Sequence, residues 1–151
     1  MAELLAGIEQ LALARWLKGS FIAYPIVNAL HIMSIGALLT SVVLMDLRIC
    51  GAFRSLPYAA FVALLRRIAL GAFAGALVTG SLLFSVKAST YAAMPVFLAK
   101  IALILLAGVN FFTFLRFARG GDEPAGSAIL AVLSILLWTS VLFAGRFIGF
   151  L

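Results

Sequence analysis

Long apolar stretches alternate with short polar segments along the chain. Charged residues are absent from four stretches, at 19–45, 68–86, 101–115 and 124–145. A transmembrane helix needs about 20 predominantly apolar residues, and three of these stretches are long enough by themselves. The third stretch is long enough if Lys100 lies inside the membrane, because the apolar character extends from Pro95 to Phe117. The pattern therefore predicts four membrane spans, at about 24–46, 68–87, 95–117 and 126–146.

The first 19 residues follow a different pattern. The apolar side chains that share one helical face here are Leu4, Leu5, Ile8, Leu11, Ala12 and Trp16. An apolar stripe beside charged residues is typical of a helix that lies in the membrane interface. A second amphipathic stretch, 57–67, leads into the second span, and a polar loop at 119–124 precedes the fourth.

The composition supports a membrane protein and excludes several other classes. The chain has 151 residues, of which 66% are apolar and 11% charged. A soluble domain has about 45–50% apolar and about 25% charged residues. Disorder requires the opposite composition, and the lone Cys50 excludes a disulfide scaffold. We therefore expect an all-α integral membrane protein, with an interfacial helix at 1–19 and a four-helix transmembrane domain at 20–151.

The chain has a net charge of +6, and the distribution of its basic residues between the two sides of the spans predicts an orientation in the membrane. Six basic residues fall in the loops after spans one and three, at positions 48, 54, 66, 67, 116 and 119. Four fall on the other side, at positions 15, 18, 87 and 146. The positive-inside rule places both termini outside a bacterial inner membrane. Nucleic-acid binding would need a basic patch on a soluble surface, so we expect contact with lipid, and with further protein chains in a homo-oligomer or membrane complex, but not with nucleic acid.

The polar residues of the first span share one helical face. They are Tyr24, Asn28, His31, Ser34 and Ser41. Lipid offers a polar side chain no partner, so this face should point into the bundle. His31 is the only histidine. It is either a neutral imidazole bonded to a neighbouring helix, or a metal or haem ligand or proton carrier.

Alternating span directions bring several cations to the same level as His31. The residues predicted in this outer half are His31, Lys87, Lys100 and Arg146, with Tyr24 and Asn28 nearby. No Asp or Glu of the spans lies at that level, so these cations have no acidic partner within the spans. We expect water, a lipid phosphate, a quinone oxygen or haem propionates to complete the site. Alternatively, Lys100 reaches outward to the interface and Arg146 anchors a helix end.

Other polar and small residues have simpler interpretations. Asp46 and Arg48 are expected to form a local ion pair at the inner end of span one. Span two carries small residues at four-residue spacing, Gly71, Gly75 and Thr79. This spacing favours close helix packing within the bundle, or else a homodimer face.

Several motifs resemble those of known membrane proteins. The run SFIAYPIVNALH at 20–31, followed by DLR at 46–48, resembles a family of bacterial four-helix membrane proteins of unknown function. PVFLAK at 95–100 and AGRFIG at 144–149 resemble that family's later motifs. The layout is distantly similar to the copper-resistance protein D family and to haem-dependent protoporphyrinogen oxidase. Those bundles carry an early histidine and, in the oxidase, a later lysine, which correspond to His31 and Lys100. Asn110 stands about where the oxidase family has a second histidine.

Three functions follow as hypotheses, and catalysis is left open. In the first, His31 binds haem b or copper in redox chemistry or metal handling, with Met94 as a further ligand. In the second, the protein is a non-catalytic subunit or scaffold of a membrane complex, or a homo-oligomer. In the third, it is a small anion or proton-coupled transporter.

Overall fold

The chain folds into helices only, over the residues that the computed structural model describes, 2–118 and 127–150. The seven helices of these ranges are α1 (Ala2–Glu9), α2 (Ala12–Gly19), α3 (Ala23–Ile49), α4 (Tyr58–Val86), α5 (Ala88–Ala93), α6 (Pro95–Ala118) and α7 (Ser127–Ile148). Four of them, α3, α4, α6 and α7, are long and apolar enough to cross a membrane. The predicted fold class, an all-α four-span bundle, is confirmed. The predicted loop at 119–124 lies outside the described residues.

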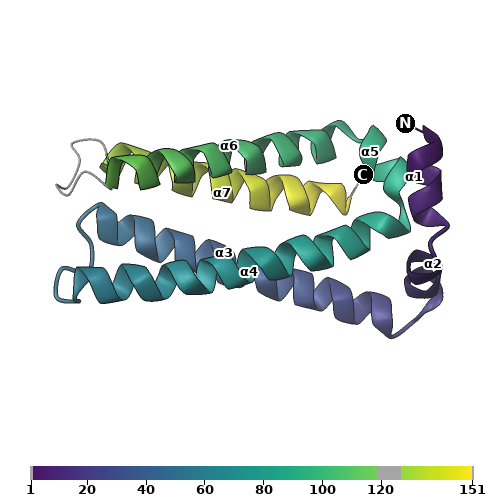
Figure 1. Ribbon diagram of the computed structural model, residues 1–151, viewed down its shortest axis with the longest axis horizontal. Helices are drawn as coiled ribbons and strands as arrows, with labels where there is room; N and C mark the ends of the chain where they lie inside the picture. The colour runs from purple at the N-terminus through teal and green to yellow at the C-terminus, as the bar shows by residue number, and fades with distance from the viewer. Residues whose placement is uncertain (1, 119–126, 151) are drawn as a thin grey trace.

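The four long helices form two antiparallel hairpins, α3–α4 and α6–α7 (Figure 1). The hairpins meet mainly where α3 packs on α7. A small core joins them, with Leu38 and Val42 of α3 against Ala69 of α4. Phe73 of α4 meets Trp138 of α7 edge to face, with ring centroids 6.0 Å apart. This core holds the bundle together near its middle.

The two ends of the bundle differ in construction. Both chain termini lie at one end, the terminal end, where α1 and α2 run across the ends of the long helices (Figure 1). At the opposite end, the loop end, residues 50–57 connect α3 to α4. Gly51 makes this turn with φ +97°, a conformation that glycine adopts without steric cost.

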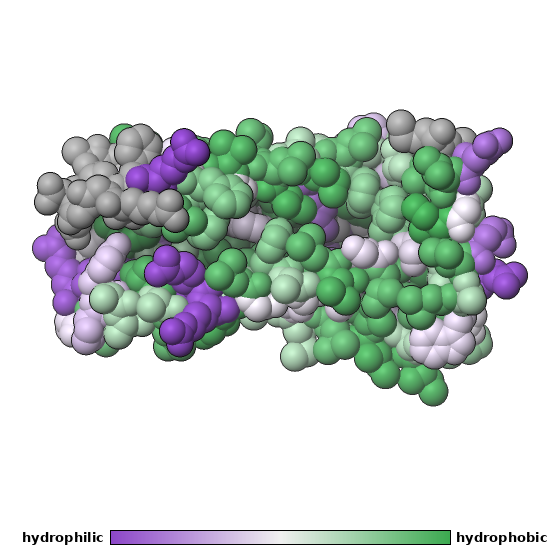
Figure 2. All heavy atoms as spheres, in the orientation of Figure 1, coloured by the Kyte–Doolittle hydropathy of each residue, from purple (hydrophilic) through white to green (hydrophobic). Residues whose placement is uncertain are grey.

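The surface agrees with a bundle that spans a bilayer. In Figure 2 apolar residues dominate the visible surface between the ends, and most hydrophilic residues gather at the two ends. Large apolar side chains on all four long helices are exposed, for example Ile32, Val78, Leu105 and Leu136. These side chains have no protein partner and would face lipid. The structure therefore supports contact with a bilayer through much of its surface.

The structure differs from the sequence expectations in three places. The predicted single helix at 1–19 is two helices, because α1 packs on α5 whereas α2 packs on α4. Ala14 and Leu17 of α2 are buried, while Trp16 points outward. The amphipathic stretch at 57–67 is continuous with the second span, so α4 begins directly after Pro57. A short helix, α5, was not expected between the second and third spans.

The predicted ion pair between Asp46 and Arg48 is wrong. Residues two apart on a helix do not face each other. Arg48 donates from Nη2 to the carbonyl oxygen of Leu56 at 3.2 Å, and its guanidinium lies 5.3 Å from the ring centroid of Tyr58. Asp46 instead turns inward and is only 4% exposed.

Candidate functional site

His31 forms a hydrogen bond that links α3 to α4. Its Nδ1 lies 2.9 Å from Oγ1 of Thr79. The Thr79 hydroxyl also lies 2.6 Å from the carbonyl oxygen of Gly75, one turn earlier on α4. A hydroxyl has one proton, and a carbonyl oxygen can only accept. Thr79 therefore donates to Gly75 and accepts from the Nδ1–H of His31.

This hydrogen bond assigns the tautomer of the His31 ring. With the proton on Nδ1, Nε2 carries an unprotonated lone pair. The hydrogen bond of Nδ1 with Thr79 is the one side-chain bond found for the ring among the described residues, and the backbone of Ala76 also lies close to the ring. The ring is half-buried, and in this tautomer its Nε2 lone pair could accept a metal, a proton or a hydrogen-bond donor.

Two glycines of α4 make room for the polar face of α3. A Cβ atom on Gly80 would lie 3.0 Å from Cε1 of His31, and one on Gly75 would lie 2.8 Å from Oγ of Ser34. Both distances are shorter than ordinary carbon contacts, so any larger residue would push the helices apart. For Gly75, packing within the bundle is thus the correct interpretation of the small-residue stripe. Gly71 faces open space.

Lys100 lies on α6, in the hairpin that does not contain His31, and packs against a glycine of α7, the other helix of its hairpin. A Cβ atom on Gly145 of α7 would lie 3.1 Å from Nζ of Lys100 and 3.4 Å from its Cε. The lysine is half-buried. Lys100 thus lies on the hairpin that does not contain His31 and Thr79, in the same half of the bundle, and its charge acts on the imidazole.

Three other predicted site residues lie on the surface. Asn28, Lys87 and Arg146 are exposed. Lys87 ends α4 and begins α5. The Arg146 guanidinium lies 4.6 Å from the ring centroid of Phe150, a cation–π contact near the terminal end. No hydrogen bond joins any of these three side chains to His31 among the described residues, and the position of Arg146 agrees with an interfacial anchor.

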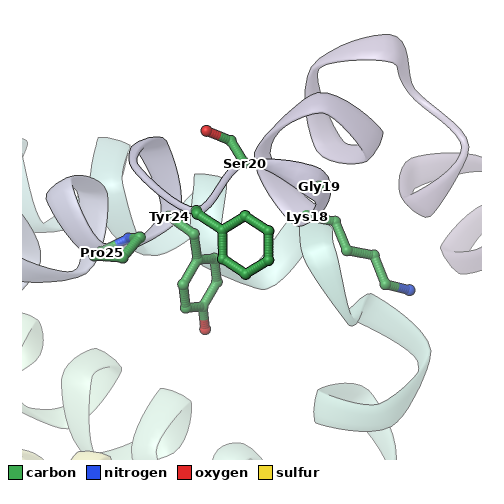
Figure 3. A pocket seen from close by; sticks show the side chains of 6 residues that line it. Lys18, Gly19, Ser20, Tyr24 and Pro25 are labelled. Atoms are coloured by element: carbon green, nitrogen blue, oxygen red, sulfur yellow. The ribbon is translucent and has the colours of Figure 1, made fainter.

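Tyr24 belongs to an open pocket where α2 meets α3. The pocket has a volume of about 240 Å³ and is lined by Lys18, Gly19, Ser20, Phe21, Tyr24 and Pro25. In Figure 3 the polar ends of Lys18, Ser20 and Tyr24 point in different directions. Ser20 already accepts the backbone N–H of Ala23 at 3.0 Å. Without converging polar groups, this pocket is a weak candidate for a specific site.

Aromatic rings close the terminal end between the hairpins. Phe84 of α4 stacks on Phe97 of α6 with centroids 5.3 Å apart, and Tyr91 of α5 stacks on both rings. Burial raises the pKa of Tyr91, and Tyr24 beside it raises it further. Tyr24 of α3 thus lies near this aromatic cluster.

The predicted metal ligand Met94 lies at the junction of α5 and α6. Nothing in the structure brings its side chain to His31. The described residues hold no group of three or more His, Cys, Asp or Glu side chains that could bind a metal ion. Any metal at His31 would therefore need ligands from outside these side chains, such as a porphyrin or water.

Sequence reasoning missed two features of the interior. Thr79 was assigned only to the small-residue stripe, although its spacing of four from Gly75 permits the bond back to that carbonyl. Asp46 and Asn110 are nine-tenths buried near the loop end, where few polar residues were expected. The available signal was their position, because Asn110 lies inside the charge-free stretch 101–115 and Asp46 directly follows the stretch 19–45.

The fold defines a multi-pass α-helical protein of membrane-like architecture. No protein-family model, curated protein or solved structure matches the chain.

Proposed function

We propose that the protein binds a b-type haem, with His31 as an axial ligand and Lys100 as the partner of a propionate. The observation that carries this proposal is the direction of the His31–Thr79 hydrogen bond. A metal-ligating histidine almost always donates its other ring N–H to an acceptor that fixes the ring. Thr79 provides that acceptor, and the Nε2 lone pair is left for the iron.

The neighbouring lysine favours haem over copper. A copper ion at Nε2 would be repelled by the Lys100 ammonium, whose charge reaches the imidazole. In haem the porphyrin compensates much of the iron charge, and the propionates are anionic. One ligand would then satisfy both the imidazole and the ammonium, which have no acidic partner at this level of the spans.

Each residue of the site has a separate task in this proposal. A bound haem supplies a redox-active iron whose potential depends on its axial ligands and surroundings. His31 holds the ligating nitrogen, Thr79 fixes the ring orientation, and Gly80 lets the ring approach α4. The chain has one histidine, so ligation by two histidines would need a second copy. If both termini lie on the outer side of the inner membrane, as the positive-inside rule predicts, this site lies in the outer leaflet.

The test is an absorption spectrum of protein purified from haem-replete cells. We expect a Soret band in the wild type, its loss in His31→Ala, and about 10–100-fold weaker haem binding in Thr79→Val. Thr113→Val is the matched control, since Thr113 bonds only to a carbonyl of its own helix. Lys100→Met should weaken binding, whereas Lys87→Met should not.

Two outcomes would overturn the proposal. One is wild-type protein that is helical by circular dichroism yet shows no Soret band after haem is added. The other is stoichiometric copper without haem, lost in His31→Ala, which would support metal handling instead.

A further inference from the structure

Three buried side-chain atoms near the loop end have no hydrogen-bond partner among the described residues. They are Oδ2 of Asp46 and Nε of Arg48 on α3, and Oδ1 of Asn110 on α6. The Asp46 and Asn110 side chains are 4% and 7% exposed, respectively. A buried acceptor without a partner is unfavourable, and Nε of Arg48, two residues from Asp46 on the same helix, forms no hydrogen bond with either oxygen. The two oxygens therefore lack a donor.

Both side chains reach the same face of α7. Asn110 donates from Nδ2 to the carbonyl oxygen of Leu130 at 3.0 Å, which fixes its amide and leaves Oδ1 as the free acceptor. Ser134 of α7 lies near the Asp46 carboxyl, although it leaves Oδ2 without a partner. Leu130 and Ser134 are four residues apart and therefore share one helical face. The unpartnered oxygens thus approach one turn of α7 from two neighbouring helices.

No described cation neutralises the Asp46 carboxyl. Arg48 and Arg54 bind backbone carbonyls of the 50–57 connection. The other basic groups at this end, Arg66 and Arg67 of α4 and Arg116 of α6, are exposed. Residues 127–140 of α7, which pack on this part of α3, contain no charged residue. An ionised carboxylate buried without a cation is strongly unfavourable.

We propose that Asp46 and Asn110 form a proton-binding site that joins the two hairpins at the loop end. A proton from water at that end adds to the Asp46 carboxylate and forms the neutral acid. The new O–H donates to the Asn110 amide oxygen, directly or through one water. One proton therefore supplies the donor that both oxygens lack. Asp46 lies three residues before the end of α3, about 4–5 Å along the axis, so the aqueous phase is close.

The test is infrared spectroscopy of the full chain in lipid nanodiscs, titrated with pH. The C=O band of a protonated carboxylic acid should persist in the wild type at neutral pH, where exposed carboxylates are ionised. Asp46→Asn should abolish the band, and Glu9→Gln, a change at an exposed carboxylate on α1, should leave it unchanged. Asn110→Leu should shift the band, because the acid loses its acceptor.

A second measurement uses stability. The melting temperature of the wild type should fall as the pH rises through the midpoint of the infrared titration. Asp46→Asn should remove this dependence, since its amide NH₂ offers the same donor at every pH. If Asp46→Asn does not fold, Asn110→Leu must still shift the infrared band. Absence of a protonated band at neutral pH would overturn the proposal, as would a band that sodium removes at constant pH, which would indicate a metal-cation site.

Discussion

The terminal half of the bundle contains partly buried bases, whereas the loop half contains a buried acid. The terminal half contains His31 and Lys100, two bases without a carboxylate from the spans. The loop half contains Asp46, an acid without a described cation. His31 and Asp46 lie on the same helix, 15 residues or about 22 Å apart. They are too far apart to neutralise each other directly.

The difference between the halves indicates what each can accept. A basic pair without an acid favours an anionic or electron-rich ligand, whereas an acid beside an amide oxygen favours a proton. In both halves the polar side chains come from different hairpins. Packing of α3 on α7 therefore controls the geometry of both sites.

The largest effect on stability should come from a larger side chain at the point where α3 packs closely on α4. Gly75→Val would place Cβ 2.8 Å from Oγ of Ser34 and should lower the free energy of unfolding by about 3 kcal/mol. Gly71→Val, which meets open space, is the control. Reversible unfolding in mixed micelles measures both. Equal losses in the two variants would show that α3 does not pack on Gly75.

Removing the unpaired ammonium should have the next largest effect, with the opposite sign. Lys100→Met keeps the side-chain length and removes a charge that is half-buried in the terminal half. We expect the free energy of unfolding to rise by about 1–3 kcal/mol in the absence of ligand. Lys87→Met, at an exposed position, should change it little. A loss of stability in Lys100→Met would mean that Lys100 has a protein partner.

Removing the bond between the hairpin helices should have a smaller effect. Thr79→Val is nearly isosteric and leaves the Nδ1–H of His31 without its acceptor. The expected loss is about 0.6–1.5 kcal/mol, the range for buried hydrogen bonds in water and in membranes. Thr113→Val, whose hydroxyl bonds only within α6, serves as control. A loss no greater than in the control would argue against the His31–Thr79 bond.

The smallest effect concerns the exposed contact between α1 and α5. Oε1 of Glu9 accepts the backbone N–H of Ser89 at 2.8 Å, and this bond lowers the pKa of Glu9 below its ordinary value of 4.5. The contact therefore stabilises docking of α1 above that value and is lost as the pH falls through the lowered pKa. Hydrogen exchange of α1 amides, corrected for intrinsic pH dependence, should accelerate on acidification. In Glu9→Gln this acceleration should disappear, whereas it should remain in Glu3→Gln.

Much of the fold could be predicted from the pattern of charges. The absence of charged residues over long stretches located all four spans, because lipid excludes charge whatever the tertiary structure. The start of α4 could not be placed this way. Arg66 and Arg67 break the apolar pattern, yet they lie at an exposed part of a helix that continues beyond the span.

The candidate site could be predicted only in part. His31 and Lys100 stood out as ionisable groups within apolar spans, and the structure brings them near each other. The predicted site also included Arg146, Lys87 and Asn28, because they were expected at the same depth in the membrane as His31. In the structure these three side chains are exposed. Depth follows from position along a helix, whereas direction depends on how each helix is rotated against its neighbours.

The sequence alone determined that this chain forms four apolar helices and carries one histidine and one lysine within them. Helix formation and insertion are local, because each span satisfies its own backbone hydrogen bonds. Only the tertiary structure decided that Thr79 holds His31, that Gly145 packs on Lys100, and that Asp46 and Asn110 turn toward α7. Those relations depend on contacts between helices, and residues far apart in the sequence carry no mark of which neighbour they will meet.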